Sequence, residues 1–266
     1  MDDIFTKTLG NSMAKQSSSN VERGAEILLA LGNAGVGGMS LAEIAEGIGD
    51  AKSAVHRALT GLSHYGFVEQ SGRRGNYKLG SAIYALAQRV PGIGDLVDLF
   101  RPALISITAG TNISSFLMAR SGFESVCLDF QLSAAPVQPL LSGVGGRLPL
   151  GIGHAGVCMM ARLDKESRER ILEINAPHYE QWQIEPDTIR AEIEMFLEKG
   201  YVTGTRKAAG YEVWTLSFAP APGDNRYGET GVSLLALANS VSDEEAQRCV
   251  ALMAEALPYK WFGLKA

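Results

Sequence analysis

The sequence predicts an α+β protein of two domains, a small and mostly helical one followed by a larger one that mixes strands and helices. Its 266 residues, 46% hydrophobic and 20% charged, suffice for two modest cores. Apolar residues recur at helical spacing as far as Gly66, and two strand-like segments follow at once. Beyond residue 112, strand-like and helical segments interchange, a pattern typical of an α+β sheet domain.

We expect four segments along the chain. They are a disordered lead at 1–20, a first domain at 21–80, a linker helix at 81–94 and a second domain at 95–266. The lead is polar and serine-rich, with little to bury. Pro91-Gly92 ends the helical pattern of the linker, whose Ala82, Ile83 and Leu86 offer an apolar face to a second subunit.

The first domain is predicted to contain a tight pair of helices after a first helix at 21–33. Ser40 and Glu43 form a capping-box pattern, which places a helix start at Leu41. Gly47 and Gly49 allow the chain to turn before a second helix begins near residue 51. The second helix turns Val55, Ala58, Leu59 and Leu62 inward, and its outward residues are Lys52, Ser53, His56, Arg57 and Thr60.

This outward face is short, polar and basic, as the reading helix of a helix-turn-helix must be to enter the major groove. Arg57 can reach guanine or phosphate, and the small Ser53 and Thr60 allow close approach. The alternative is an ordinary amphipathic helix pair in a helical core. A predicted hairpin decides between them, since residues 67–70 and 76–79 resemble strands around a tip that carries Arg73 and Arg74. Helices followed by a basic hairpin are the winged-helix arrangement.

The second domain is predicted from a change in the spacing of apolar residues, from the period of a helix to that of a strand. A long helix at 95–109, which contains Pro102, comes first. Strands are expected at 113–120, 124–131, 201–205, 211–219 and 231–238, and helices at 154–162, 165–174, 188–198 and 243–257.

Composition limits the class of protein. The three cysteines form neither a disulfide framework nor a CxxC pair, which favours a reducing, cytoplasmic location. The sequence shows neither a membrane span nor a signal peptide pattern. Because the net charge is −5, contact with DNA must come from a local basic patch.

The chain resembles the IclR family of bacterial transcription regulators over nearly its whole length after Asn20. The segments that carry the resemblance are VERGAEILLAL, SLAEIAEGIG, AKSAVHRALTGLSHYGFVEQ, YKLG, GGRLPLGIGHAG and FLEKGY. The resemblance implies a winged helix-turn-helix, a linker helix used in dimerisation and a GAF-like domain that binds a small effector, usually an organic acid. Family members repress or activate catabolic operons as homodimers or dimers of dimers on a double-stranded DNA operator.

A glycine-rich segment at 145–153 runs into a predicted helix, so the backbone N–H groups of His154, Ala155 and Gly156 suit a carboxylate. The resemblance places the effector there, an aromatic carboxylate among the candidates. It adds Tyr211, Val213, Thr215 and Ser217 on one face of a strand, with Leu140 and Leu148 as apolar walls. For each wall residue, plain core is the alternative.

Other functions remain as rivals. His154 and Cys158 stand four residues apart on one helical face, but two residues make a weak metal site, and we expect buried core residues, no metal and no cofactor. Catalytic motifs such as GxSxG, HExxH or a phosphate-binding loop are lacking, which disfavours an enzyme. The alternatives are a helix-turn-helix adaptor that binds only protein, or a hydrolase-like enzyme with a fused DNA-binding domain. Effector, operator, direction of regulation and the choice between dimer and tetramer stay open.

Overall fold

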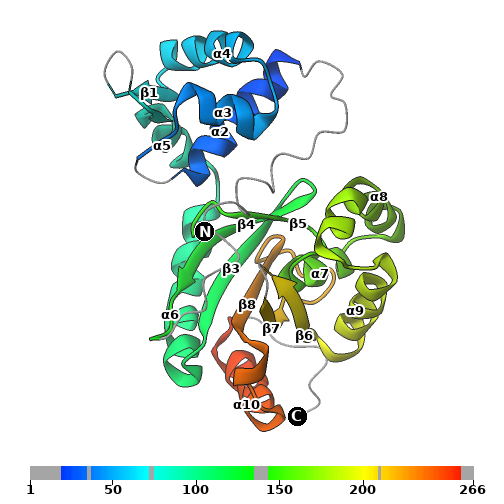
Figure 1. Ribbon diagram of the computed structural model, residues 1–266. Helices are drawn as coiled ribbons and strands as arrows, with labels where there is room; N and C mark the ends of the chain where they lie inside the picture. The colour runs from blue at the N-terminus through cyan, green and yellow to red at the C-terminus, as the bar shows by residue number, and fades with distance from the viewer. Residues whose placement is uncertain (1–18, 35–36, 72–74, 135–142, 209–210, 259–266) are drawn as a thin grey trace. The chain divides into compact units, whose positions relative to one another are not determined.

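A computed structural model describes residues 19–34, 37–71, 75–134, 143–208 and 211–258, and only the backbone at 208 and 211. The chain divides into two units, Met1–Pro91 and Gly92–Ala266 (Figure 1). The predicted α+β class is confirmed, with a helical first unit and a sheet with flanking helices in the second. Within the described ranges, no helix is both long and apolar enough to cross a bilayer.

The first unit is built from helices and a small antiparallel hairpin. Its elements are α2 (Asn20–Asn33), α3 (Leu41–Ile48), α4 (Lys52–His64), β1 (Val68–Gln70), β2 (Tyr77–Leu79) and α5 (Ser81–Ala87). The chain enters α3 through the expected reciprocal cap between Ser40 and Glu43. It leaves α3 through Gly49, whose φ of 66° is the left-handed conformation that favours glycine.

The core of this unit lies where α2, α3 and α4 meet. Ile27, Ile44, Val55 and Leu59 are fully buried there. An ion pair of 2.6 Å between Arg23 Nε and Asp50 Oδ2 ties α2 to the turn before α4. The angle between α3 and α4 is thus fixed by apolar packing and by one ion pair at their turn.

The buried face of α2 does not include all of its apolar residues. Val21 and Leu29 are 81% and 39% exposed. The buried residues are Ile27, Ala30 and Leu31, joined by Arg23. Arg23 lies inward because Asp50 pairs with it, so the charged side chain replaces an apolar one in the stripe.

The second unit is larger, and its strands form one sheet. Its elements are α6 (Ile93–Thr111), β3 (Ser114–Ser121), β4 (Glu124–Gln131), β5 (Arg147–Pro149), α7 (His154–Ala161), α8 (Lys165–Trp182), α9 (Pro186–Lys199), β6 (Tyr201–Ala208), β7 (Tyr211–Phe218), β8 (Thr230–Leu237), a 3-10 turn η1 (Ala238–Ser240) and α10 (Asp243–Ala256). Among the described residues the strand order is β5-β4-β3-β8-β7-β6, with antiparallel neighbours.

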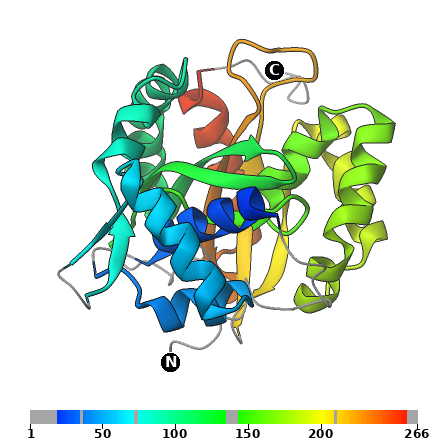
Figure 2. The ribbon, with the colours of Figure 1, turned by 90° about the horizontal axis from the view of Figure 1, so that it is seen from above.

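Helices cover both faces of this sheet. Helices α7, α8 and α9 share one core with Met118 and Val213, whereas α6 and α10 share another with Leu117 and Trp214. Neighbouring residues of one strand therefore pack into the cores on opposite faces of the sheet, because successive side chains of a strand point to opposite faces. Figure 2 shows α8 and α9 together on one side of the sheet. The packing places α7 directly against the strands.

Several elements differ from the sequence expectation. The linker helix expected at 81–94 ends at Ala87, and β6 continues to Ala208 where a strand ending at 205 was expected. Helix α8 was expected to end at residue 174, yet it continues through Pro177 to Trp182. Pro177 is exposed, as is Glu173 four residues earlier, so water can satisfy the carbonyl that loses its partner. Strand β5 was not predicted at all, because three residues that include Pro149 at a sheet edge leave no periodic signal.

Candidate functional site

The outward face of α4 is where the sequence placed it. Lys52, Ser53, His56, Arg57 and Thr60 are all exposed, whereas Val55 and Leu59 lie in the core. The Thr60 hydroxyl donates to the His56 carbonyl at 2.9 Å, which directs its proton into the helix. The face thus offers two basic side chains, one histidine and small hydroxyl residues to a groove.

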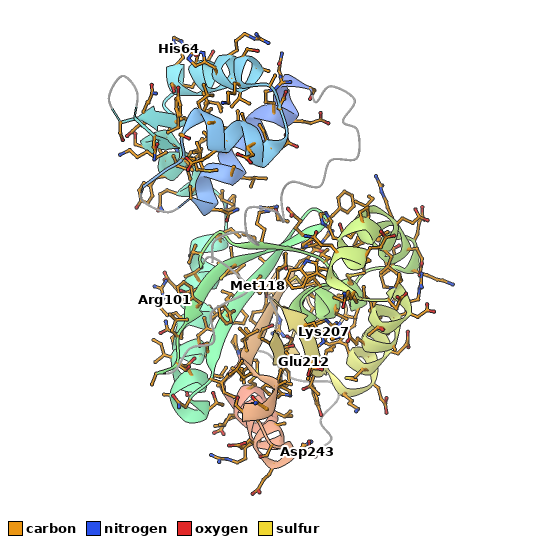
Figure 3. The ribbon with its side chains drawn as sticks, viewed as in Figure 1. His64, Arg101, Met118, Lys207, Glu212 and Asp243 are labelled. Carbon is orange, nitrogen blue, oxygen red and sulfur yellow. The ribbon has the colours of Figure 1, made fainter. Side chains whose placement is uncertain are left out.

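The hairpin that follows α4 carries a third basic residue. Lys78 on β2 lies 3.7 Å from Glu69 on β1, and both side chains are about half exposed. The predicted tip residues Arg73 and Arg74 lie outside the described residues. Figure 3 places His64 at the end of α4 and shows the exposed side chains of this unit.

The glycine-rich segment leads into α7 as predicted, and every residue of this helix is buried. Its N-cap is Gly153, which has no side chain to cap the first turn. The first backbone N–H groups of a helix lack intrahelical partners and lie at the positive end of the helix dipole. Three such groups, on His154, Ala155 and Gly156, belong to residues that line a cavity.

This cavity lies between α7 and the middle of the sheet and has a volume of about 50 Å³. Its walls are apolar side chains, three hydroxyls and the start of α7. They comprise Phe116, Met118, Ser125, Leu148, Gly153, His154, Ala155, Gly156, Thr215, Ser233, Leu234 and Leu235. Figure 3 shows Met118 on β3, in the central part of the sheet. The cavity is thus smaller than typical ligand pockets, which measure about 300–1,000 Å³.

Five of the nine expected effector residues line the cavity, namely Leu148, His154, Ala155, Gly156 and Thr215. Val213 and Ser217 do not. Val213 is fully buried in the core beneath α7, and the Ser217 hydroxyl pairs with that of Ser233 at 2.5 Å. Leu140 and the side chain of Tyr211 lie outside what the structure describes.

A buried polar network lies behind the cavity and was missed by the sequence reasoning. Arg206 on β6 donates from Nη1 and Nη2 to the two carboxylate oxygens of Glu192 on α9, at 2.8 and 2.5 Å. Glu192 also lies 3.3 Å from Nε2 of His154, whose Nδ1 is hydrogen-bonded to the Thr215 hydroxyl. The network joins α7, α9, β6 and β7.

A signal for this network exists in the sequence. Glu192 interrupts the apolar stripe of Ile189, Ile193 and Phe196 at helical spacing. Arg206 takes the inward position of a strand whose alternate residue Val202 is buried. A charge on each of two apolar faces predicts a buried pair, because neither can be buried alone.

Burial sets the protonation state of the network. Burial lowers the pKa of His154, and the positive charge of Arg206 adds to that, so the imidazole is neutral at pH 7. Burial alone would raise the pKa of Glu192, but hydrogen bonds from His154 and Arg206 outweigh it and lower this pKa to about 2. Glu192 is therefore a carboxylate that can only accept hydrogen bonds.

Gly204 on β6 makes room for the imidazole. A Cβ atom at this position would lie 3.3 Å from Cε1 of His154, closer than side chains normally pack. Gly204 pairs in register with Thr215, so the ring lies across two neighbouring strands. His154 and Cys158 do not converge on a metal, since both ring nitrogens are engaged and the Cys158 thiol donates to the Ser217 carbonyl.

A larger cavity, of about 380 Å³, lies elsewhere in this unit, between the end of α6 and the start of α10. Its Thr111 and Ser240 hydroxyls donate to carbonyls of their own segments, both at 2.8 Å. Its charged residues, Glu245 and Arg248, are exposed. The smaller cavity is therefore the better candidate for ligand recognition, because buried hydroxyls and a helix N-terminus line it.

The buried histidine predicts a pH dependence of stability. The unfolded chain takes up a proton near the ordinary pKa of 6.5, whereas burial lowers the pKa of His154 in the fold. The free energy of unfolding should therefore fall as pH drops below about 6.5. Calorimetry between pH 7.5 and 5.5 should show this slope in the wild type and a weaker one in His154→Gln. His64→Gln, on the exposed end of α4, should keep the slope; equal slopes in all three proteins would contradict the assignment.

The first unit, with its helices and following hairpin, is a winged helix-turn-helix domain. A family model described as the IclR helix-turn-helix domain matches residues 20–72. This match confirms, for the helix-turn-helix region, the resemblance to the IclR family seen in the sequence.

Curated relatives resemble the chain in sequence, and solved structures resemble it in fold. The chain is 25% identical over 144 residues to the transcriptional repressor IclR of Escherichia coli, a match of 53% of this chain and 52% of that one. It thus spans about half the length of the curated relatives that it matches first. An IclR regulator from Alicyclobacillus acidocaldarius shares the fold, with a TM-score of 0.68 at 21% identity over 89% of this chain and 95% of that one. An IclR homolog from Microbacterium hydrocarbonoxydans, complexed with 4-hydroxybenzoate, has a TM-score of 0.63 at 17% identity, over 90% and 99% of the two chains.

Proposed function

We propose that this protein is a DNA-binding transcriptional regulator controlled by a small organic acid bound in its second unit. The observation that carries the proposal is the exposed, polar and basic face of α4 within a winged helix-turn-helix domain of the IclR family. Such a face enters the major groove, while the wing follows the phosphate backbone. The name of the Escherichia coli relative supports repression as the outcome.

We assign Arg57 to base reading and Lys52 to phosphate contact, with Ser53, His56 and Thr60 framing the contact. The tip arginines, Arg73 and Arg74, are assigned to phosphates beside the groove. Arg73→Ala or Arg74→Ala should weaken binding to all DNA sequences alike. Each should also reduce the slope of the logarithm of the binding constant against the logarithm of salt concentration by about one. Anisotropy titrations over a salt series measure both quantities, and a loss confined to one sequence would contradict the phosphate role.

The effector is assigned to the cavity at the start of α7. Its carboxylate would accept hydrogen bonds from the first N–H groups of the helix, and its body would lie against Leu148, Phe116 and Met118. Since the cavity measures about 50 Å³, an effector must displace its walls. Ligand binding is then coupled to a change of conformation, as a sensor requires. The 4-hydroxybenzoate complex of a relative keeps an aromatic carboxylate among the candidates.

We propose that the regulator acts as a homodimer or a dimer of dimers, with α5 as the linker helix at the subunit contact. No residue of α5 is buried, and Tyr84 and Leu86 are 70% and 53% exposed. Ala82 and Ile83, expected on the partner face, are half-buried in the described part of the chain. The partner surface is therefore centred on Tyr84 and Leu86.

A charge in this surface should separate the subunits. Leu86→Asp would place a carboxylate in an apolar contact. The free-energy cost of removing this charge from water exceeds what the contact can offset. Sedimentation at micromolar concentration should show a shift toward monomer, together with a footprint of one half-site. Asp95→Ala, an exposed change outside α5, is the control and should sediment like the wild type. A wild-type protein that is already monomeric would refute the dimer.

The two rival functions lose support. Burial raises the pKa of the Cys127 thiol to about 12 and that of Cys158 well above its ordinary value, so neither is a ready nucleophile. A protein-binding adaptor would not need a cavity lined by hydroxyls. A ligand-dependent rise in melting temperature separates sensor from adaptor. The proposed location is the cytoplasm, where the operator is.

The experiment has two parts. Genomic fragments selected by the purified protein should contain a shared two-part sequence that binds more tightly than random DNA at physiological salt. Calorimetric titration of carboxylic acids, each compared with its amide, should then identify the acids that bind. The affinity of the protein for its operator should change when such an acid is present. Uniform binding of all DNA would refute the regulator, and equal binding of acids and amides would refute the carboxylate at α7. Ala155→Asp, which adds a negative charge at the first turn, should abolish acid binding.

A further inference from the structure

The first turn of α4 is the part of the helix that leads into the groove, yet apolar packing does not hold it. Residues 51–53 are exposed, and the first fully buried side chain of the helix is that of Val55. The N-cap residue, Ala51, has no side chain that could accept a hydrogen bond from this turn. Because the N-terminal residues of a reading helix contact the base edges, the position of this turn matters directly for recognition.

Asp50 supplies the contact that packing does not. Its Oδ1 accepts a hydrogen bond of 2.7 Å from the backbone N–H of Ala51, and its own N–H donates to the carbonyl of Ala45 on α3 at 3.0 Å. The carboxylate thus lies between the end of α3 and the start of α4. Its second oxygen, Oδ2, reaches a partner on another helix.

That partner is Arg23 on α2. Nε of Arg23 donates to Oδ2 of Asp50 at 2.6 Å, and Nη1 donates to the side-chain oxygen of Asn20, the first residue of α2, at 2.7 Å. The side chains of Arg23 and Asp50 are only 11% and 19% exposed, so salt and water screen the pair little. The pair therefore links α2 to the start of α4 across 27 residues of sequence.

We propose that Arg23 is a positioning residue for DNA recognition, which acts through Asp50 to set where the first turn of α4 lies. The inference rests on the proposed reading role of α4 and adds a residue outside both the reading face and the wing. An ion pair that only stabilised the fold would change the folded fraction and nothing else. An ion pair that only balanced charge would change binding to all DNA sequences alike, because binding without sequence preference is electrostatic. A positioning pair changes the preference for the operator over other DNA.

The test measures the ratio of two affinities, for the selected operator and for random DNA, at a temperature where each protein is folded by circular dichroism. In Arg23→Met and in Asp50→Asn this ratio should fall about tenfold, since coupling of this size is usual within one ion-pair network. Asp50→Asn keeps the oxygen that accepts from Ala51 and removes a negative charge, so its binding to random DNA should not weaken. Arg89→Met, at an exposed arginine of the same unit, is the control and should keep the wild-type ratio.

An unchanged ratio in either variant overturns the inference, whatever happens to the melting temperature. If Arg23→Met fails to fold, Asp50→Asn decides alone, because asparagine has the shape of aspartate. The double variant should lose no more of the ratio than either single variant, since both act on one contact, and additive losses would overturn Asp50 as the route. A wild type that binds all DNA alike would refute the regulator and this inference with it, whereas a wild-type preference that the variants keep would overturn the inference alone.

Discussion

Glu192→Ala is expected to destabilise the second unit by about 3–5 kcal/mol, because it leaves the guanidinium of Arg206 buried without its partner. The two side chains retain only 11% and 7% of their exposure, so water cannot replace the lost carboxylate without disturbing the packing of α9. His154 loses its acceptor at the same time. Urea unfolding of the full chain, followed by a probe in the second unit, measures the loss.

Two comparisons make this result specific. Glu169→Ala removes a partner of Arg190 in an exposed pair, of 45% and 41% exposure, and should change the free energy of unfolding little. The double variant Glu192→Leu with Arg206→Met should recover most of the stability, since apolar residues of similar size can replace a buried pair. If Glu192→Ala unfolds like Glu169→Ala, the pair is not buried in solution.

The first unit could be predicted closely from the sequence because its structure is set by local interactions. Helix α3 begins where the reciprocal cap of Ser40 and Glu43 requires, and the following turn uses Gly49. These signals lie within a few residues of the elements that they define. The exposed face of α4 then follows from helical periodicity alone.

The pocket could be predicted only in part, because its walls come from distant strands. The start of α7 was predicted from its glycines, whereas Thr215 was named only through the resemblance to the IclR family. Ser125 and Phe116 lie on β4 and β3, and their place opposite α7 depends on a strand order that no local pattern specifies. Val213 was expected to contact the effector, yet it lies in the core beneath α7. Alternation predicts on which face of the sheet a side chain lies, but not whether it lines the cavity or packs in the core.

Arg57→Ala is expected to cost about 1–3 kcal/mol for each half-site and to relax the preference for one base pair. On an operator with two half-sites, the loss per dimer is about 2–6 kcal/mol, or roughly 30-fold or more in affinity. The reason is the position of Arg57, which is exposed in the middle of α4 and beside the small residues that permit close approach. Competition between operator and variant sequences, position by position, measures both effects.

Two substitutions separate base reading from simple charge. Arg57→Lys keeps the charge but loses the planar fork that pairs with guanine, so it should retain nonspecific affinity and lose the base preference. Arg89→Ala removes an equal charge from an exposed position outside α4 and should leave the preference intact. A phosphate contact would give another pattern, in which Arg57→Ala weakens all sequences equally and lowers the salt dependence of log K by about one. That pattern would transfer Arg57 from base reading to backbone contact and leave the reading of the operator to Ser53, His56 and Thr60.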